Sequence, residues 1–351
     1  MELLKQLYMV SSPSRDEKDM FSFIKEWMGQ HGIECQVYNW GITATKGLSE
    51  TYPCIVAHMD EVHDRHVGKR IFETENGLLF GYDIVKGEQC GIGADDKNGI
   101  WVALKMLERL DAVKVAFFVG EEIGCIGSKQ CDLGFFDDCR YVIQCDRRNG
   151  GDFITDAGVE LCSKAFIRDC NIERFGYHEE HGLMTDVLEL KERGLKVSSV
   201  NLSCGYYHPH TAEELTVFSQ LENCLEFVEW ICTNLTEVYE HEAPRRFYGR
   251  YGGGYGYGWD DWYYDPNEDD YYGYGEYFGK GADKSVDNED SAYSFIYDEL
   301  CWYDQLEDCP SATDLFDEWN CCGGKGVGKK KFKKIYAQVA KDLKEFYGMP
   351  A

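Results

Sequence analysis

Five short stretches of the chain carry side chains that can bind divalent metal ions. They are His58-Met59-Asp60, Asp95-Asp96-Lys97-Asn98-Gly99, Glu121-Glu122, Asp146, and His210 ahead of Glu213-Glu214. Together they supply two imidazoles and several carboxylates, enough to hold two divalent cations and leave one carboxylate over. A spare carboxylate beside a metal-bound water can take its proton. The set therefore predicts an enzyme that performs metal-assisted hydrolysis.

Each stretch also has a simpler interpretation when it is taken alone. The stretch at residues 58–60 could be a polar contact at a strand end. The stretch at 95–99 could cap a helix, where Asp is favoured. Glu121-Glu122 could be a solvated acidic turn. Asp146 is followed by Arg147-Arg148 and could belong to a surface salt-bridge cluster. Either His208 or His210 could be the last ligand, or both could be structural. The order of the whole set favours the metal site.

Predicted helices and strands alternate along residues 1–240. Helical spacing predicts helices over 3–10, 16–28, 100–110, 186–193 and 215–235, with Ser14 as a candidate cap of the second. Apolar and β-branched runs predict strands over 33–38, 53–57, 113–119, 141–144 and 197–202. This alternation predicts an α/β fold: a mixed, largely parallel twisted sheet with helices on both faces.

The predicted strands would bring the stretches together. His58, Glu121-Glu122 and Asp146 each follow a strand-like run. In open α/β sheets, sites gather at the carboxyl ends of the strands. Residues far apart in the sequence can therefore meet at one edge of the sheet.

The ordered set resembles the co-catalytic zinc exopeptidases, which include peptidase T-type tripeptidases, glutamate carboxypeptidases and related zinc aminopeptidases. That group carries H-x-D, a metal-bridging Asp in D-D-K-x-G, E-E, an Asp, and a His ahead of an acidic residue. The stretches most similar to the peptidase T-type branch are Gly93-Ala-Asp-Asp-Lys-Asn-Gly99, Glu121-Glu-Ile-Gly124, Thr185-Asp186 and Gly205-Tyr-Tyr. The resemblance covers about residues 1–240 and implies a zinc-exopeptidase-like fold.

The resemblance also implies a ligand set for two divalent metal ions. Asp95 would bridge the two ions. His58 and Asp146 would complete one site, and Glu122 and His210 would complete the other. Zinc is the expected metal for mixed imidazole and carboxylate ligands, and cobalt or manganese would also fit.

The remaining residues of the set receive supporting roles from the same resemblance. Glu121 would be the general base, which takes a proton from a metal-bridging water, the nucleophile, and passes it to the leaving amine. Asp60 would orient the imidazole of the first stretch. His210 is preferred to His208 as the ligand, because an acidic residue, Glu214, follows it four positions on.

One departure from the group concerns the connection between Asp146 and His210. Many members insert a separate lid or dimerisation domain there, and the lid supplies a catalytic histidine. The connection in this chain is too short for such a domain. His178 and His181 lie within it and could substitute for the missing histidine, or they could be solvated surface residues.

Composition limits the partners and the compartment. The net charge of −27 disfavours binding to nucleic acid, which needs clustered Lys and Arg. No apolar run reaches the roughly 18–20 residues that span a bilayer, so we expect no membrane partner. Residues 1–10 lack the pattern of a signal peptide, and we expect a cytoplasmic protein.

The chain contains 16 cysteines, which could be structural thiols or metal ligands. Many, such as Cys54, Cys145 and Cys204, lie in apolar runs, where a reduced cysteine behaves as a small buried hydrophobic residue. Cys321-Cys322, with Cys301 and Cys309 nearby, could bind a metal, but their spacing matches no zinc-ribbon pattern. We therefore expect reduced structural thiols.

Two further segments follow the predicted catalytic domain at residues 1–243. Residues 244–284 are rich in Gly, Tyr and Asp, with no helical or strand period. Residues 285–351 predict a small helical module, with helices over 290–306 and 314–319 and a basic amphipathic helix over 329–347. The Gly-Tyr segment could be an adhesive interface that makes a homo-oligomer, or a linker.

These observations predict a dinuclear metal-dependent exopeptidase, most simply an aminopeptidase that acts on short peptides. A carboxypeptidase or an amide deacylase would share the same core. A third alternative is a peptidase-like assembly protein that associates through its Gly-Tyr segment.

Overall fold

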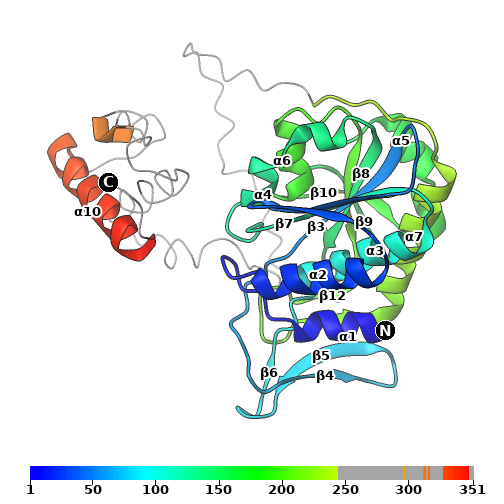
Figure 1. The fold of residues 1–351 in the computed structure, drawn as a ribbon, viewed down its shortest axis with the longest axis horizontal. Helices are drawn as coiled ribbons and strands as arrows, with labels where there is room; N and C mark the ends of the chain where they lie inside the picture. Colours follow the sequence, from blue (N-terminus) through cyan, green and yellow to red (C-terminus); the bar gives the residue numbers. More distant parts are fainter. Residues whose placement is uncertain (244–295, 297–310, 314, 317–326, 348–351) are drawn as a thin grey trace, which may run out of the picture. The chain divides into compact units, whose positions relative to one another are not determined.

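The computed structural model describes residues 1–243, 296, 311–313, 315–316 and 327–347 (Figure 1). The backbone divides into two compact units, Met1–Tyr251 and Gly252–Ala351. The first unit holds all five metal-binding stretches. The predicted low-complexity segment, the four cysteines of the C-terminal third and most of the helices predicted over 290–306 and 314–319 lie outside the described residues.

An eight-stranded sheet forms the centre of the first unit. Its strands lie in the order β1-β2-β7-β3-β8-β11-β9-β10. Their bounds are β1 Cys35–Tyr38, β2 Gly41–Lys46, β3 Tyr52–His58, β7 Val113–Phe118, β8 Cys139–Arg147, β9 Asp152–Asp156, β10 His178–His181 and β11 Ser199–Ser203. The central strands β7, β3, β8 and β11 run parallel, whereas β1, β2 and β7 pair antiparallel, as do β11 and β9. The predicted mixed, largely parallel sheet is confirmed.

Helices cover both faces of this sheet, as predicted (Figure 1). The helices on one side are α1 Glu2–Met9, α2 Lys18–Gln30, α3 Ala94–Arg109, α5 Lys164–Cys170 and α7 Phe218–Asn234, and those on the other are α4 Ile126–Gln130 and α6 Asp186–Glu192. Along β3, Ile55 and Ala57 pack with the first set, and Cys54 and Val56 pack with the second. Both faces of the strand are therefore buried, which explains its continuous apolar sequence.

A smaller sheet connects the metal-binding candidates at residues 95–99 to those at residues 210–214. It consists of β4 Lys69–Glu73, β5 Leu78–Asp83, β6 Glu88–Cys90, β12 Tyr206–Tyr207 and β13 Leu215–Val217. The order is β12-β13-β5-β4, and β6 also pairs with β5. Because β6 leads into the turn before Asp95 and β12 and β13 flank His210, this sheet draws the two segments together. β6, β12 and β13 are only two or three residues long, and none of the five strands was predicted from the sequence.

Two predicted element boundaries near the stretches are wrong. The helix predicted over 215–235 begins at Phe218, because residues 215–217 pair with β5. The helical segment predicted from residue 100 begins at Ala94, with non-helical backbone at Asp95 and Asp96. Ala94 and residues 96–99 are small or polar and yet buried, so this stretch lacks the apolar spacing that predicts a helix.

Two predicted local features are also wrong. Ser14 does not cap α2: the residue before that helix is Glu17, and the Ser14 hydroxyl donates to Asp60 Oδ2 at 2.8 Å. Asp146 lies inside β8 rather than after it. β8 continues beyond the predicted apolar run because neighbouring strand β11 pairs with it as far as Arg147.

The cysteines in apolar runs are buried and free, as predicted. Cys54, Cys145 and Cys204 are fully buried and free. No helix in the described part of the chain is long and apolar enough to cross a membrane.

The second unit contains the predicted basic helix, α10 Lys329–Tyr347. Its apolar side chains join a separate small core. That core consists of Ile296, Leu315, Val327, Phe332, Ile335 and Val339. The lysines at 329–331, 333 and 334 are exposed.

Gly41 shows how closely the first strands pack. Its φ is +154°, and a Cβ there would lie 2.1 Å from the carbonyl oxygen of Phe117 on β7. We expect Gly41→Ala to lower the free energy of unfolding by about 1–3 kcal/mol. The control is Gly29→Ala in α2, where an added Cβ would have no described atom within 4 Å apart from its chain neighbours and the backbone of its own helix. Alanine should stabilise there by about 0.5–1 kcal/mol. Denaturant unfolding measures both, and equal stabilities would contradict the expectation.

Candidate metal centre

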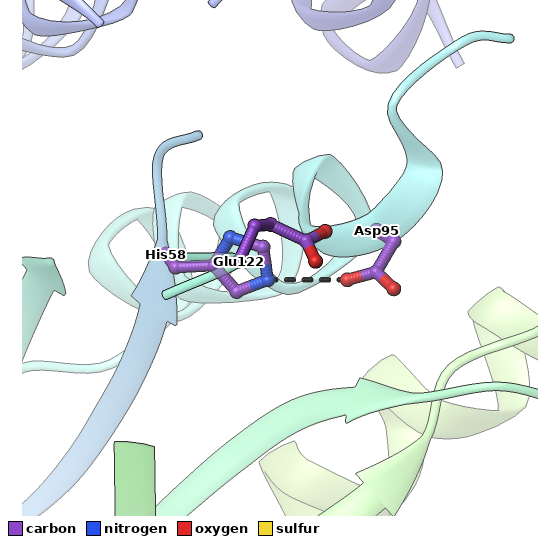
Figure 2. A group of neighbouring side chains, drawn as sticks. All are labelled: His58, Asp95 and Glu122. Atoms are coloured by element: carbon purple, nitrogen blue, oxygen red, sulfur yellow. Dashed lines mark hydrogen bonds and ion pairs between the residues drawn. The ribbon is translucent and has the colours of Figure 1, made fainter. Parts of the chain in front are cut away.

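The fold brings the five stretches to one place. His58 ends β3, Asp146 lies near the end of β8, and Glu121-Glu122 follow β7 after a short turn. These three parallel strands deliver their side chains at the same edge of the sheet. Asp95 lies at the start of α3, and His210 lies in the loop between β12 and β13. Figure 2 shows the side chains of His58, Asp95 and Glu122 gathered from three separate elements.

The Asp95 carboxylate contacts both histidines. Its Oδ1 lies 3.1 Å from His58 Nε2, and its Oδ2 lies 3.4 Å from His210 Nε2. Asp146 Oδ1 lies 3.6 Å from His58 Nε2, and Glu122 Oε2 lies 3.0 Å from His210 Nε2. The cluster thus has two halves that share one carboxylate. The groups whose ligand atoms lie close together, His58 with Asp95 and Glu122, and His58 with Asp96 and Asp146, cut across the two sites that the resemblance implies. The assignment of ligands to two ions therefore stays a prediction.

The donor set fits divalent cations. Ligand atoms of His58, Asp95 and Glu122 all lie within 4.8 Å of one another. Glu122 Oε1 is buried and has no hydrogen-bond partner among the described residues. A buried acceptor without a partner costs about 1–3 kcal/mol, and more for a charged group. A cation at this place would satisfy that oxygen.

The pKa values of the cluster reflect crowded charge. Burial, together with the charge of Asp95, raises the pKa of Glu122 to about 7. Burial raises the pKa of Glu121 well above its usual range, and nearby Asp146 adds to this. Burial alone would lower the pKa of His210, but hydrogen bonds to Asp95 and Glu122 outweigh it and raise the pKa to about 11. The raised pKa values mean that the crowded carboxylates favour bound protons and a protonated His210. A site that stabilises positive charge in this way suits a metal cation.

Asp96 also lies near His58 and Asp146, within the same 4.8 Å limit. Its Oδ1 accepts from Gly99 N at 2.9 Å and its Oδ2 accepts from His58 N at 3.2 Å. One Asp96 oxygen is thus hydrogen-bonded to the backbone at the start of α3, and the other to the backbone at the end of β3. A cis peptide bond joins Asp95 to Asp96, and the two carboxylates have different surroundings.

Asp60 connects two of the stretches. Its backbone oxygen lies 3.0 Å from His58 Nδ1, and its Oδ1 lies 3.4 Å from the same nitrogen. Its carboxylate also accepts from Glu121 N at 2.9 Å and from Glu122 N at 3.2 Å. Besides the predicted contact with His58, it therefore fixes the acidic turn after β7.

Sequence reasoning missed the residues that hold Asp146. Gln144 Nε2 donates to Asp146 Oδ2 at 3.0 Å, and Asn201 both donates to and accepts from the Asp146 backbone at 2.9 Å. Tyr206 donates to Asp95 Oδ2 at 3.1 Å and lies 3.5 Å from Asp146 Oδ1. A signal was present for two of them: Gln144 and Asn201 are polar residues inside apolar strands, and they lie opposite each other in β8 and β11.

The structure does not bring the other histidines into the cluster. His178 and His181 lie on the edge strand β10, 3.7 Å from Asp152 and Asp156 respectively. His208 is exposed. Within the described residues, no hydrogen bond or ion pair joins any of these three side chains to the cluster.

Known proteins share this fold. No protein-family model matches the chain, and no curated protein matches it. Among solved structures, aminopeptidase PepT from Bacillus cereus matches with a TM-score of 0.52 and 14% identity, over 67% of this chain and 98% of that one. The first unit therefore shares the fold of aminopeptidase PepT, which confirms the α/β fold and the resemblance in fold that the sequence predicts.

Two other solved structures are similar at lower scores. A TET aminopeptidase from a marine sediment Thaumarchaeota archaeon has a TM-score of 0.49 and 16% identity, over 68% of this chain and 97% of that one. A tripeptidase from Staphylococcus aureus has a TM-score of 0.47 and 13% identity, over 66% of this chain and 97% of that one.

The ligand assignment can be tested by counting bound ions. His210 contacts two carboxylates of the cluster and His208 contacts none within the described residues. After zinc loading and gel filtration, we expect two ions per chain in the unaltered protein, one in His210→Ala and two in His208→Ala. Mass spectrometry of the metal content gives these numbers. Loss of an ion from His208→Ala, with both retained in His210→Ala, would contradict the assignment.

Proposed function

We propose that this chain is a dinuclear metal-dependent aminopeptidase that acts on short peptides. The observation that carries the proposal is the Asp95 carboxylate, whose two oxygens face two different imidazoles. His58 and Asp146 would hold one ion with Asp95, and Glu122 and His210 would hold the other. Zinc is the expected metal, with cobalt or manganese as alternatives.

When bound, two such ions would polarise the scissile carbonyl and lower the pKa of a water molecule between them. Glu121 is the residue best suited to accept the proton of that water. It is buried beside the cluster, and it forms no ion pair with a described residue. Its backbone is held by Asp60, which also contacts His58. The base is therefore fixed relative to one half of the metal centre, and it can return the proton to the leaving amine.

The aminopeptidase assignment is supported by the fold shared with aminopeptidase PepT. Carboxypeptidase and deacylase activities use the same core, but no observation among the described residues favours them. Oligomerisation through residues 244–351, which the Gly-Tyr segment suggested, likewise stays a sequence prediction. The expected partners are a short peptide and two cations, with no nucleic acid or membrane.

A pair of peptides tests both the activity and its direction. The zinc- or manganese-loaded protein is incubated with a free tripeptide and with its N-acetylated twin, and products are identified by mass spectrometry. We expect release of the N-terminal residue from the free peptide alone. Cleavage at the other end, or of the blocked peptide alone, would instead indicate a carboxypeptidase or a deacylase.

Glu121→Gln separates the base from the metal ligands. Gln has nearly the same shape but cannot take a proton, so we expect kcat to fall by about 10²–10⁴-fold, the usual contribution of general base catalysis. Metal content should stay at the unaltered value, because Glu121 is not among the proposed ligands. Full activity of the variant would contradict its role, whereas loss of an ion would show that Glu121 is a ligand.

A further inference from the structure

We propose that Glu214 and His63 are positioning residues of the metal centre, which hold the turn at residues 91–95 so that Asp95 faces both histidines. Neither is a proposed ligand or the proposed base. The inference rests on the proposed function, because it assumes that Asp95 binds metal. It assigns to the acidic residue after His210 a task that its place in the sequence does not reveal.

The Glu214 carboxylate accepts hydrogen bonds from the backbone N–H groups of this turn. Its Oε2 accepts from Ile92 N at 2.8 Å and from Gly93 N at 2.6 Å, and its Oε1 accepts from Asp95 N at 3.2 Å. The side chain is fully buried. Hydrogen bonds from backbone N–H groups to a buried carboxylate are among the stronger ones in proteins. One carboxylate thus fixes the backbone of the shared residue and of the turn that precedes it.

His63 holds Glu214 in place. Its Nε2 lies 3.0 Å from Glu214 Oε2, and its side chain is only 10% exposed. The imidazole occupies the space beside Gly91, where a Cβ would lie 2.1 Å from a ring carbon. Gly91 is therefore required for the imidazole to reach Glu214.

A second buried pair closes the other side of the turn. Lys97 Nζ lies 2.8 Å from Glu61 Oε2 and donates to the carbonyl oxygen of Ile92 at 3.1 Å. At Gly93, where φ is +64°, a Cβ would lie 2.2 Å from the same Glu61 oxygen. The turn is thus held between two acid–base pairs, which bind its N–H groups on one side and a carbonyl on the other.

These hydrogen bonds and ion pairs join the segments that carry His58, Asp95 and His210, and they need no metal ion. Glu61 and His63 continue the chain just after the first stretch, and Glu214 ends the fifth. Because Asp95 is shared by both halves of the centre, its displacement would weaken both ions together. Loss of a residue that orients a metal ligand typically lowers metal affinity or activity by 10–100-fold.

The neighbouring residue Glu213 supplies a matched control. It is exposed, and within the described residues its carboxylate makes no hydrogen bond or ion pair. The experiment compares Glu214→Gln, Glu214→Ala, His63→Ala and Glu213→Gln in the full-length chain. Zinc affinity is measured by competition with a chromophoric chelator, and thermal unfolding of the metal-free protein is measured in parallel.

We expect Glu214→Ala and Glu214→Gln to bind both zinc ions about 10–100-fold more weakly, His63→Ala to shift in the same direction, and Glu213→Gln to match the unaltered protein. If Glu214→Ala does not fold, Glu214→Gln and His63→Ala give the result. Equal zinc affinity in every variant would overturn the inference, even if the metal-free protein melts at a lower temperature. Failure of the unaltered protein to bind zinc would instead overturn the metal centre itself, and the inference with it.

Discussion

The site concentrates negative charge in a buried place. Asp95, Asp146, Glu121 and Glu122 lie at one edge of the sheet, where carboxylates repel one another and lose their hydration. Two imidazoles cannot balance four carboxylates, and in the part of the chain that the structure describes one Glu122 oxygen has no hydrogen-bond partner. Such an arrangement is costly unless cations neutralise it. The surrounding fold must therefore hold the carboxylates in place, and cations bound there would contribute to the stability of the site.

The fold meets this requirement with rigid elements and backbone contacts. Three adjacent parallel strands deliver His58, Asp146 and the Glu121-Glu122 turn, and Asp60 ties the first of these to the last. The small second sheet brings His210 toward Asp95. Buried polar partners set the orientation of two of these groups. Asp146 is held by Gln144 and Asn201, and the turn before Asp95 is held by Glu214.

Much of this could be predicted from the sequence, for physical reasons. A strand buried on both faces has a continuous apolar sequence, so β3 and β7 were recognised. The order and spacing of His58, Asp95 and Glu121-Glu122 indicated a shared site before any geometry was known. The likeness of the first unit to aminopeptidase PepT confirms the fold that this order implied.

The rest depends on long-range pairing, which residue patterns do not contain. Strands of two or three residues, such as β12 and β13, exist only because their partners are present. Asp95 and Asp96 are chemically identical, and so are Glu213 and Glu214. The resemblance singles out Asp95 as the bridging residue, but the contacts that distinguish the two are visible only in the folded chain: Asp96 accepts from Gly99 N, whereas Asp95 lies beside His58 Nε2.

The central claim is that one carboxylate joins two metal ions, and anomalous diffraction from zinc-loaded crystals tests it most directly. Data collected on either side of the zinc absorption edge locate each ion without assumptions about its ligands. The account predicts two peaks that share Asp95, one beside His58 and Asp146 and the other beside Glu122 and His210. A single peak, or two peaks that leave Asp95 without a metal contact, would contradict it.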